Sequence, residues 1–142
     1  MPVIHADQAA VHTMHGTSFT AYASPQRGSR ELCAWHIEIP GRTTGIRHHV
    51  SREEVLYVLS GTIQASVDGR AEHAAAGDVI LVPAGAQFGV DNPADEPATA
   101  WVTTSVGFRG ISESGLWNVQ PIYGRHEPAF LQRRSQLVNL QE

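Results

Sequence analysis

Glycine and proline interrupt this sequence at short intervals along most of its length, which leaves little room for long helices. The segments between them are short and rich in β-branched and aromatic residues, as in Thr17 to Ala23, Leu32 to Ile39 and Val55 to Leu59. Short segments of this kind, separated by turn residues, are typical of an all-β sandwich or barrel. No segment between Thr17 and Gly107 shows a sustained 3.6-residue apolar period. We therefore predict an all-β fold.

Turn residues also place individual strands. Asp68-Gly69 follows the run Thr62 to Val67, and this dipeptide tolerates the positive φ angles of a tight hairpin turn. Val79 to Val82 is an apolar run that Pro83 ends, because proline has no N–H for a ladder. These signals predict a hairpin around residues 68–69 and a separate strand that stops before Pro83.

Two later segments predict a strand and a helix. Ala98 to Val106 alternates between small or apolar residues and more polar or aromatic ones, which indicates a strand with one buried face. Glu127-Pro128 precedes AFLQRRSQLVNL, and proline is favoured at the first position of a helix. We expect one short C-terminal helix there, at the end of an otherwise all-β chain.

Length and charge narrow the class of protein. The 142 residues fit one domain, and a net charge of −4 with 17% charged residues gives no basic stripe for nucleic acid. No apolar run approaches the roughly 18 residues of a membrane span. The single cysteine, Cys33, cannot form an internal disulfide, and the N-terminus lacks the pattern of a signal peptide. We predict a cytoplasmic protein that partners neither nucleic acid nor membrane.

The stretch from Gly41 to Gly61, GRTTGIRHHVSREEVLYVLSG, has a distinctive spacing. Five residues separate Gly41 from Arg47, one separates Arg47 from His49, four lie between His49 and Glu54, and six precede Gly61. This spacing resembles the first conserved motif of the cupin superfamily, in which a histidine occupies the position of Arg47. One metal-ligand position of the family is therefore replaced here.

A second block resembles the partner motif of the same family. It runs from Gly77 through Pro83 and Gly85 to Phe88 and Asn92, and here too the family's histidine is missing. The resemblance implies a single cupin domain over residues 1–142, a double-stranded β-helix or jelly-roll barrel. Its conserved motifs span about residues 30–106, between an N-terminal arm (1–29) and a C-terminal tail (107–142). It also implies a homodimer.

In the family, three imidazoles and a glutamate usually hold Fe, Mn, Ni or Zn, which accept nitrogen and oxygen ligands. Strand alternation in the motif register directs Arg47 and His49 into the barrel and His48 outward. Arg47 has no lone pair to donate, and Phe88 supplies no ligand. A one-residue shift makes His48 the first ligand but puts Val50 at the second. Each register therefore contributes one inward histidine.

Two readings of this site stay open. A β-bulge that turns both His48 and His49 inward would join them with Glu54 in a two-histidine, one-carboxylate metal set. Otherwise the pocket is metal-free, and Arg47 pairs with Glu54 or receives an anionic group of a ligand. No cofactor is firmly predicted, and a divalent transition metal remains the alternative. His49 and Glu54 are the candidates for catalysis, and in the metal-free pocket His49 would act as a general base or a hydrogen-bond donor.

Apolar and amide side chains complete the predicted pocket. Phe88 and Trp101 are expected to supply aromatic wall and Gln87 an amide, because small-molecule sites combine apolar surface with a few polar groups. The predicted ligand-binding set is Arg47, His49, Glu54, Gln87, Phe88 and Trp101.

The predicted function is the binding of a small molecule, an anionic organic metabolite, in the barrel. The alternative is a cupin enzyme, with or without metal, of the isomerase, cyclase, decarboxylase or dioxygenase type, acting on a small organic substrate. A third reading is a barrel kept mainly for homodimerisation. Fold resemblance does not choose among them, because function belongs to the site.

Overall fold

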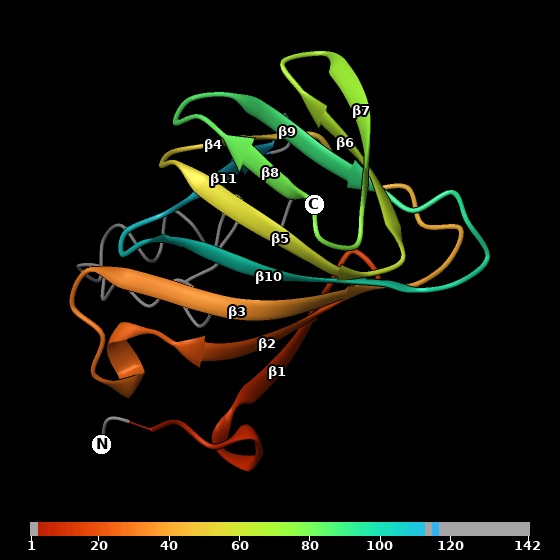
Figure 1. Ribbon diagram of the computed structural model, residues 1–142. Helices are drawn as coiled ribbons and strands as arrows, with labels where there is room; N and C mark the ends of the chain where they lie inside the picture. The colour runs from red at the N-terminus through yellow and green to blue at the C-terminus, as the bar shows by residue number, and fades with distance from the viewer. Residues whose placement is uncertain (1–2, 113–114, 117–142) are drawn as a thin grey trace.

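The computed structural model describes residues 3–112 and 115–116, and within them all of the regular structure except two single turns is β-strand (Figure 1). The turns are 3-10 helices at η1 (Ala6–Gln8) and η2 (Pro25–Arg27). None of the described helices is both long and apolar enough to cross a membrane. The all-β prediction is confirmed, and the helix predicted after Glu127-Pro128 lies outside the described residues.

The strands form two six-stranded antiparallel sheets. The first sheet has the order β1 (Ala10–Met14), β2 (Thr17–Ala23), β3 (Leu32–Ile39), β10 (Ala98–Ser105), β5 (Glu54–Ser60), β8 (Val79–Val82). The second has the order β12 (Gly115–Leu116), β11 (Gly110–Ser112), β4 (His48–Val50), β9 (Gln87–Asp91), β6 (Thr62–Val67), β7 (Arg70–Ala75). In Figure 1 the N-terminal hairpin of β1 and β2 extends the lower sheet beside β3.

The strand predictions agree closely with these bounds. Four predicted segments match β2, β3, β6 and β8 residue for residue, while β5 is one residue longer at each end and β10 ends at Ser105. Asp68 and Gly69 have φ angles of 49° and 80°, the left-handed pair of the predicted hairpin turn between β6 and β7. Local turn chemistry and apolar alternation were sufficient here, because both act within a few residues of the chain.

The core lies between the inner faces of the two sheets. Along β10 the side chains of Ala98, Ala100, Val102 and Thr104 are buried and the four alternate ones are half-buried, as the predicted alternation requires. The largest fully buried side chains come from both sheets and include Trp35, Ile39, Leu56, Ile63 and Val82. Burial of one such apolar side chain contributes roughly 1.5–3 kcal/mol to the stability of the folded state.

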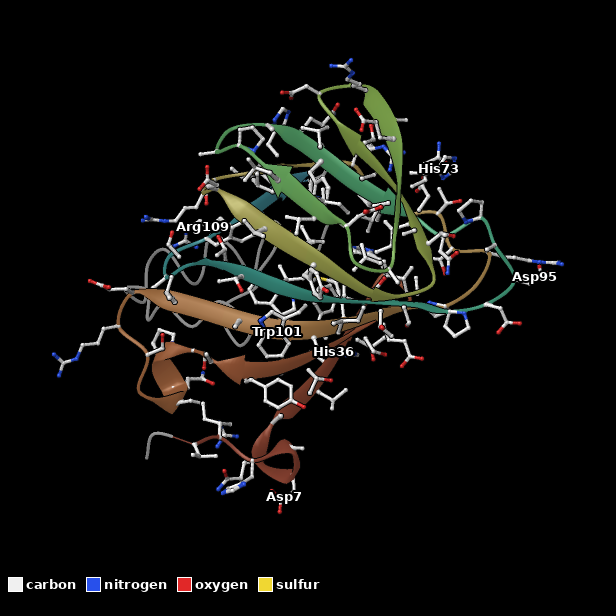
Figure 2. The ribbon with its side chains drawn as sticks, viewed as in Figure 1. Asp7, His36, His73, Asp95, Trp101 and Arg109 are labelled. Atoms are coloured by element: carbon white, nitrogen blue, oxygen red, sulfur yellow. The ribbon has the colours of Figure 1, made fainter. Side chains whose placement is uncertain are left out.

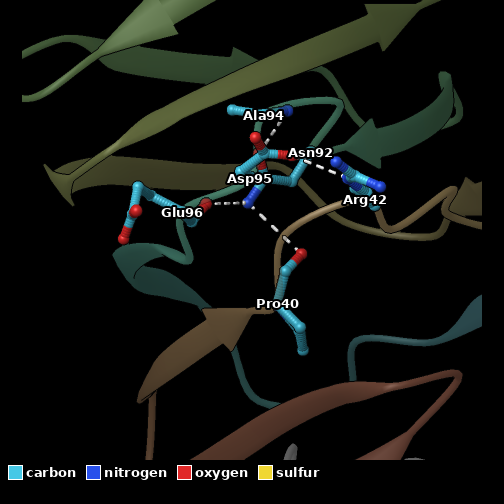
Figure 3. A network of polar contacts seen from close by, with 6 residues as sticks. All are labelled: Pro40, Arg42, Asn92, Ala94, Asp95 and Glu96. Carbon is cyan, nitrogen blue, oxygen red and sulfur yellow. Dashed lines mark hydrogen bonds and ion pairs between the residues drawn. The ribbon is translucent and has the colours of Figure 1, made fainter.

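A buried asparagine ties the turn after β9 to the end of β3 (Figure 3). The side chain of Asn92 is completely buried, and its Nδ2 donates to the carbonyl oxygens of Ile39, Pro40 and Glu96 at 3.1, 3.2 and 2.8 Å. Its Oδ1 accepts the N–H of Ala94 at 3.2 Å. The amide therefore satisfies backbone groups that the loops leave outside the sheet ladders.

Candidate functional site

A small cavity opens between the inner faces of the two sheets. Its volume is about 70 Å³, and one water needs roughly 10–15 Å³, so the cavity has room for several waters or one small organic molecule. The apolar lining includes Phe19, Trp35, Ile37, Leu56, Phe88 and Val102. The polar lining residues are His15, Thr17, His48 and Glu54. The cavity is therefore mainly apolar, with a few polar groups on its wall.

Glu54, the first residue of β5, is the buried acid of this cavity. It lies between Val82 of β8 and Thr104 of β10 in the sheet, and only 5% of its surface is exposed. Its Oε2 is buried and has no hydrogen-bond partner among the described residues. Burial raises the pKa of this carboxyl to about 8. Glu54 is therefore protonated at neutral pH, and it can donate a hydrogen bond.

His48, at the start of β4, faces the same cavity from the opposite sheet. Its Nδ1 lies 3.0 Å from the carbonyl oxygen of Ile46, and a carbonyl only accepts, so Nδ1 carries the hydrogen and Nε2 carries the acceptor lone pair. Burial lowers the pKa of the imidazole to about 4, despite the opposing effect of the Ile46 bond. The ring also makes an edge contact with Phe88 at a centroid distance of 6.0 Å. His48 is therefore a neutral imidazole with a defined tautomer.

The predicted inward orientation of Arg47 and His49 is wrong. Neither residue lines the cavity; both are exposed, and Nδ1 of His49 lies 3.2 Å from the carbonyl oxygen of Gly85. The strand adopts the register shifted by one residue, in which His48 faces the cavity and Val50 is 1% exposed. The physical reason is that this register buries the apolar Val50 and leaves the Arg47 charge in contact with water.

Arg47 binds a carboxylate on the outer face of the second sheet. Its guanidinium donates to both oxygens of Asp91, at 2.9 and 3.3 Å, and this bond lowers the pKa of Asp91. The side chain crosses Gly89, where any Cβ would collide with the guanidinium arm. The predicted pair between Arg47 and Glu54 does not form, because Arg47 is bound to Asp91 on the outer face of the second sheet whereas Glu54 is buried at the cavity between the sheets.

The three remaining predicted residues divide between the cavity and the surface. Phe88 is 3% exposed and lines the cavity, as expected. Gln87 points the other way, and its backbone N–H donates to the carboxylate of Asp68 at 2.9 Å. Trp101 lies on the outer face of the first sheet against Tyr22, with ring centroids 5.4 Å apart, where Figure 2 labels it near His36. Gln87 and Trp101 do not contribute to the cavity wall.

The donors of this cavity do not fit the family's metal set. Val50 and Phe88 stand at two ligand positions of the register that the strand adopts, and neither offers a lone pair. His48 and His49 pair in unbroken order with Phe88 and Gln87 of β9, so the bulge that would turn both inward is absent from this ladder. The described residues contain no group of three or more histidine, cysteine, aspartate or glutamate side chains placed to hold a metal ion.

The N-terminal hairpin supplies cavity residues that sequence reasoning missed. Met14, His15 and Thr17 line the cavity, and the turn between β1 and β2 has φ angles of 52° at His15 and 80° at Gly16. The dipeptide His15-Gly16 was the available signal, because histidine is among the residues that tolerate a left-handed conformation and glycine follows it. The run Ala10 to Met14 lacks a clear apolar alternation, so its sequence does not by itself indicate a strand before this turn.

The two titrating groups predict a distinctive pH dependence of stability. Glu54 ionises near 4.5 when unfolded and near 8 when native, so the native state holds the extra proton in that window and stability falls as pH rises through it. His48 titrates at about 4 when native and 6.5 when unfolded, so its contribution rises with pH in that window. The stability contributions of Glu54 and His48 therefore change in opposite directions up to about pH 6.5. Between pH 6.5 and 8 we expect the free energy of unfolding to fall by up to about 1.4 kcal/mol per pH unit.

Urea denaturation of the natural chain and of Glu54→Gln measures this effect. The glutamine keeps the shape of the side chain without the titrating group, so the loss between pH 6.5 and 8 is expected to vanish in the variant. The exposed neighbour gives the control, since Glu53→Gln is expected to behave as the natural chain. An unchanged loss in Glu54→Gln would contradict the assignment.

Comparison with known proteins identifies the fold. The Cupin_2 model, described as a cupin domain, matches residues 35–104. An RmlC-like cupin from Shewanella frigidimarina superposes with a TM-score of 0.64 at 23% identity, covering 74% of this chain and 90% of that one. The polyketide cyclase RemF from Streptomyces resistomycificus superposes with a TM-score of 0.66 at 18% identity, covering 74% of this chain and 79% of that one. A predicted oxalate decarboxylase from Thermotoga maritima superposes with a TM-score of 0.63 at 14% identity, covering 72% of this chain and 97% of that one.

A search of curated proteins finds no match. The structural likenesses are below 25% identity, so they establish the fold and leave the chemistry to the site. The sequence model and the solved structures agree on that fold. Residues 35–104 form a cupin domain of the Cupin_2 family, and the chain belongs to the cupins.

Proposed function

We propose that this cupin binds one small, neutral and mainly apolar organic molecule that carries a hydroxyl or carbonyl oxygen. The observation that carries the proposal is the Glu54 carboxyl, which is buried at the cavity wall with its Oε2 unpartnered among the described residues. A buried polar group without a hydrogen bond costs about 1–3 kcal/mol. A ligand oxygen that accepts from Glu54 removes that cost.

The charges around the cavity favour a neutral ligand over the anionic one expected from the sequence. The described lining residues include neither arginine nor lysine, and His48 and Glu54 are both uncharged at neutral pH. Arg47, the predicted clamp, is bound to Asp91 on the outer face. A carboxylate entering this cavity would lose its hydration and meet no cation, which is strongly unfavourable.

Matched pairs of small rings test the proposal. We expect phenol and cyclohexanone to raise the melting temperature of the protein, and benzoate and cyclohexanecarboxylate to leave it unchanged, because ligands stabilise the state that binds them. Loss of one hydrogen bond of about 1.4 kcal/mol should weaken phenol binding about tenfold in Glu54→Leu.

Two surface variants complete that experiment. Arg47→Ala and Glu53→Gln are expected to bind phenol as the natural chain does, because neither side chain reaches the cavity. Tighter binding of benzoate than of phenol, together with its loss in Arg47→Ala, would favour the anion clamp and overturn the proposal.

The predicted homodimer has a candidate surface on the outer face of β5 and β8. Tyr57, Leu59, Val79 and Leu81 are exposed there, and Val55 pairs with Leu81 and Tyr57 with Val79 across the two strands. Arg70 and Glu72 border this apolar strip, since they line a shallow hollow together with Val79 and Leu81. A second copy about a twofold axis would place the same apolar strip, with both charge signs beside it, against this one.

Sedimentation of the natural chain and of Leu81→Asp tests the dimer. The natural chain is expected to sediment as a dimer and Leu81→Asp as a monomer, since the aspartate would place a charge in the apolar contact. Val11→Asp changes an exposed valine on β1, at the opposite edge of the same sheet, and should remain dimeric. A natural chain that is monomeric at high concentration would refute this assembly.

A further inference from the structure

The mouth of the cavity is marked by the lining residues that also reach solvent. Most of the described lining residues are buried or half-buried, and only two of them, His15 and Ile46, are exposed. His15 lies in the turn between β1 and β2, and Ile46 lies in the loop that leads from β3 into β4. Because these two segments line the same cavity and meet solvent, a ligand enters between them.

The polar end of the cavity lies away from this mouth. Glu54, whose carboxyl would donate to a ligand oxygen, is only 5% exposed, whereas Ile46 is 41% exposed. A ring whose hydroxyl meets Glu54 therefore directs the opposite, para position of the ring toward the mouth. A substituent at that position meets the side chain of Ile46.

Ile46 is held in place through both of its neighbours in the chain. The N–H of Gly45 donates to Oδ1 of Asp91 at 2.8 Å, and the guanidinium of Arg47 donates to both oxygens of the same carboxylate at 3.3 and 2.9 Å. The carbonyl oxygen of Ile46 itself lies 3.0 Å from Nδ1 of His48. The Ile46 side chain is β-branched and therefore stiff at χ1. Asp91 thus fixes the backbone on either side of a rigid apolar side chain.

The same loop lies directly against β9. A Cβ at Gly45 would collide with the backbone carbonyl oxygen of Val90, so the two backbones are already as close as they can be. Two residues earlier, the N–H groups of Thr43 and Asn92 each donate to the other's carbonyl oxygen, at 2.9 and 2.8 Å. The position of Ile46 is therefore set by β9 and the residue that follows it.

We propose that Ile46 sets the size of the ligand and that Asp91 is the positioning residue that holds Ile46 at the mouth. The ligand class is then a single ring without a branched group opposite its oxygen. This inference rests on the proposed function, because it uses the same cavity and the same hydrogen bond from Glu54. One extra methylene in a hydrophobic pocket typically changes discrimination by about 10-fold or more, so one side chain is sufficient for this selection.

Phenol and 4-tert-butylphenol test the role of Ile46, with titration calorimetry of the full chain as the measurement. We expect the natural chain to bind 4-tert-butylphenol about 10-fold more weakly than phenol, because the branched group meets Ile46. Ile46→Ala is expected to abolish this difference and to leave phenol binding nearly unchanged. The matched control is Ile111→Ala, since Ile111 of β11 is 43% exposed and does not line the cavity. It should keep the selectivity of the natural chain.

Asp91→Ala tests the positioning role. It should narrow the difference between the two phenols by about threefold, because a loop held by fewer hydrogen bonds opens more of the time. In Ile46→Ala the same change should have no further effect, since residues that act through one another are not additive. Asp95→Ala removes an exposed carboxylate that pairs with Arg42, and it is expected to leave the difference unchanged. A merely structural role of Asp91 would weaken the binding of both phenols equally and would refute its positioning role.

The remaining outcomes separate this inference from the proposed function. The comparison of the two phenols on the natural chain requires no variant to fold. If the natural chain binds 4-tert-butylphenol as tightly as phenol, or if Ile46→Ala keeps the difference, the inference is refuted while phenol binding still supports the proposed function. If neither phenol binds, the proposed function fails and the inference fails with it. If Asp91→Ala changes the selectivity further in Ile46→Ala, Asp91 does not act through Ile46.

Discussion

Asn92→Asp is expected to lower the free energy of unfolding by about 4 kcal/mol, equivalent to a fall of about 12 °C in the melting temperature. The wild-type amide donates to three backbone carbonyl oxygens and is fully buried (Figure 3). An aspartate has nearly the same shape, but it would place an acceptor against those acceptors. It would therefore either carry a buried charge or bind a proton that satisfies only one carbonyl. Thermal and urea denaturation measure the change.

The matched control lies three residues further along the same turn. Asp95 pairs with Arg42 at 2.6 Å, but both side chains are more than 70% exposed, and exposed pairs contribute about 0–1 kcal/mol. Asp95→Asn is therefore expected to change stability by less than about 1 kcal/mol. If Asn92→Asp were as mild as Asp95→Asn, the hydrogen bonds of Asn92 would not be holding this turn.

Gly41→Ala is the second substitution with a large expected effect. A Cβ at Gly41 would overlap the backbone carbonyl oxygen of Asp95 and crowd that of Ala94, and backbone atoms cannot move aside as a side-chain end can. The loops would have to separate, which would strain the hydrogen bond from Arg42 N–H to the Ala94 carbonyl. We expect a loss of about 3 kcal/mol, measured by urea denaturation.

Gly69→Ala separates this crowding from backbone conformation. Gly69 has a φ of 80° in the β6–β7 turn, but a Cβ there would meet nothing within 4 Å. Its expected cost is therefore only the left-handed strain of about 1 kcal/mol. A Gly41→Ala variant no less stable than Gly69→Ala would show that the two loops yield easily, contrary to their close approach.

The candidate site was predictable only in part. Glu54 and Phe88 follow from the motif spacing, and both line the cavity. The orientation of the histidines was predicted wrongly at β4, which has three residues and contains two adjacent histidines. Its own sequence therefore fits two registers, in one of which His48 faces the interior and in the other His49. A shift of one residue exchanges every side chain between the two faces. The contacts that select one register come from Phe88 on β9 and from Asp91, which lie far along the chain.

The sequence by itself determined the strands β2, β3, β5, β6, β8 and β10, the hairpin turn at Asp68-Gly69 and the family, because strand alternation, turn residues and glycine spacing act over short stretches of chain. Tertiary structure alone decided which of His48 and His49 shares a cavity with Glu54, where Arg47 places its charge, and that the His15 turn closes against the barrel. The physical reason is that burial is a property of the packed sheets. It selects Val50 over Arg47 for the interior and sets the protonation of Glu54 and His48, and no local pattern of residues contains that information.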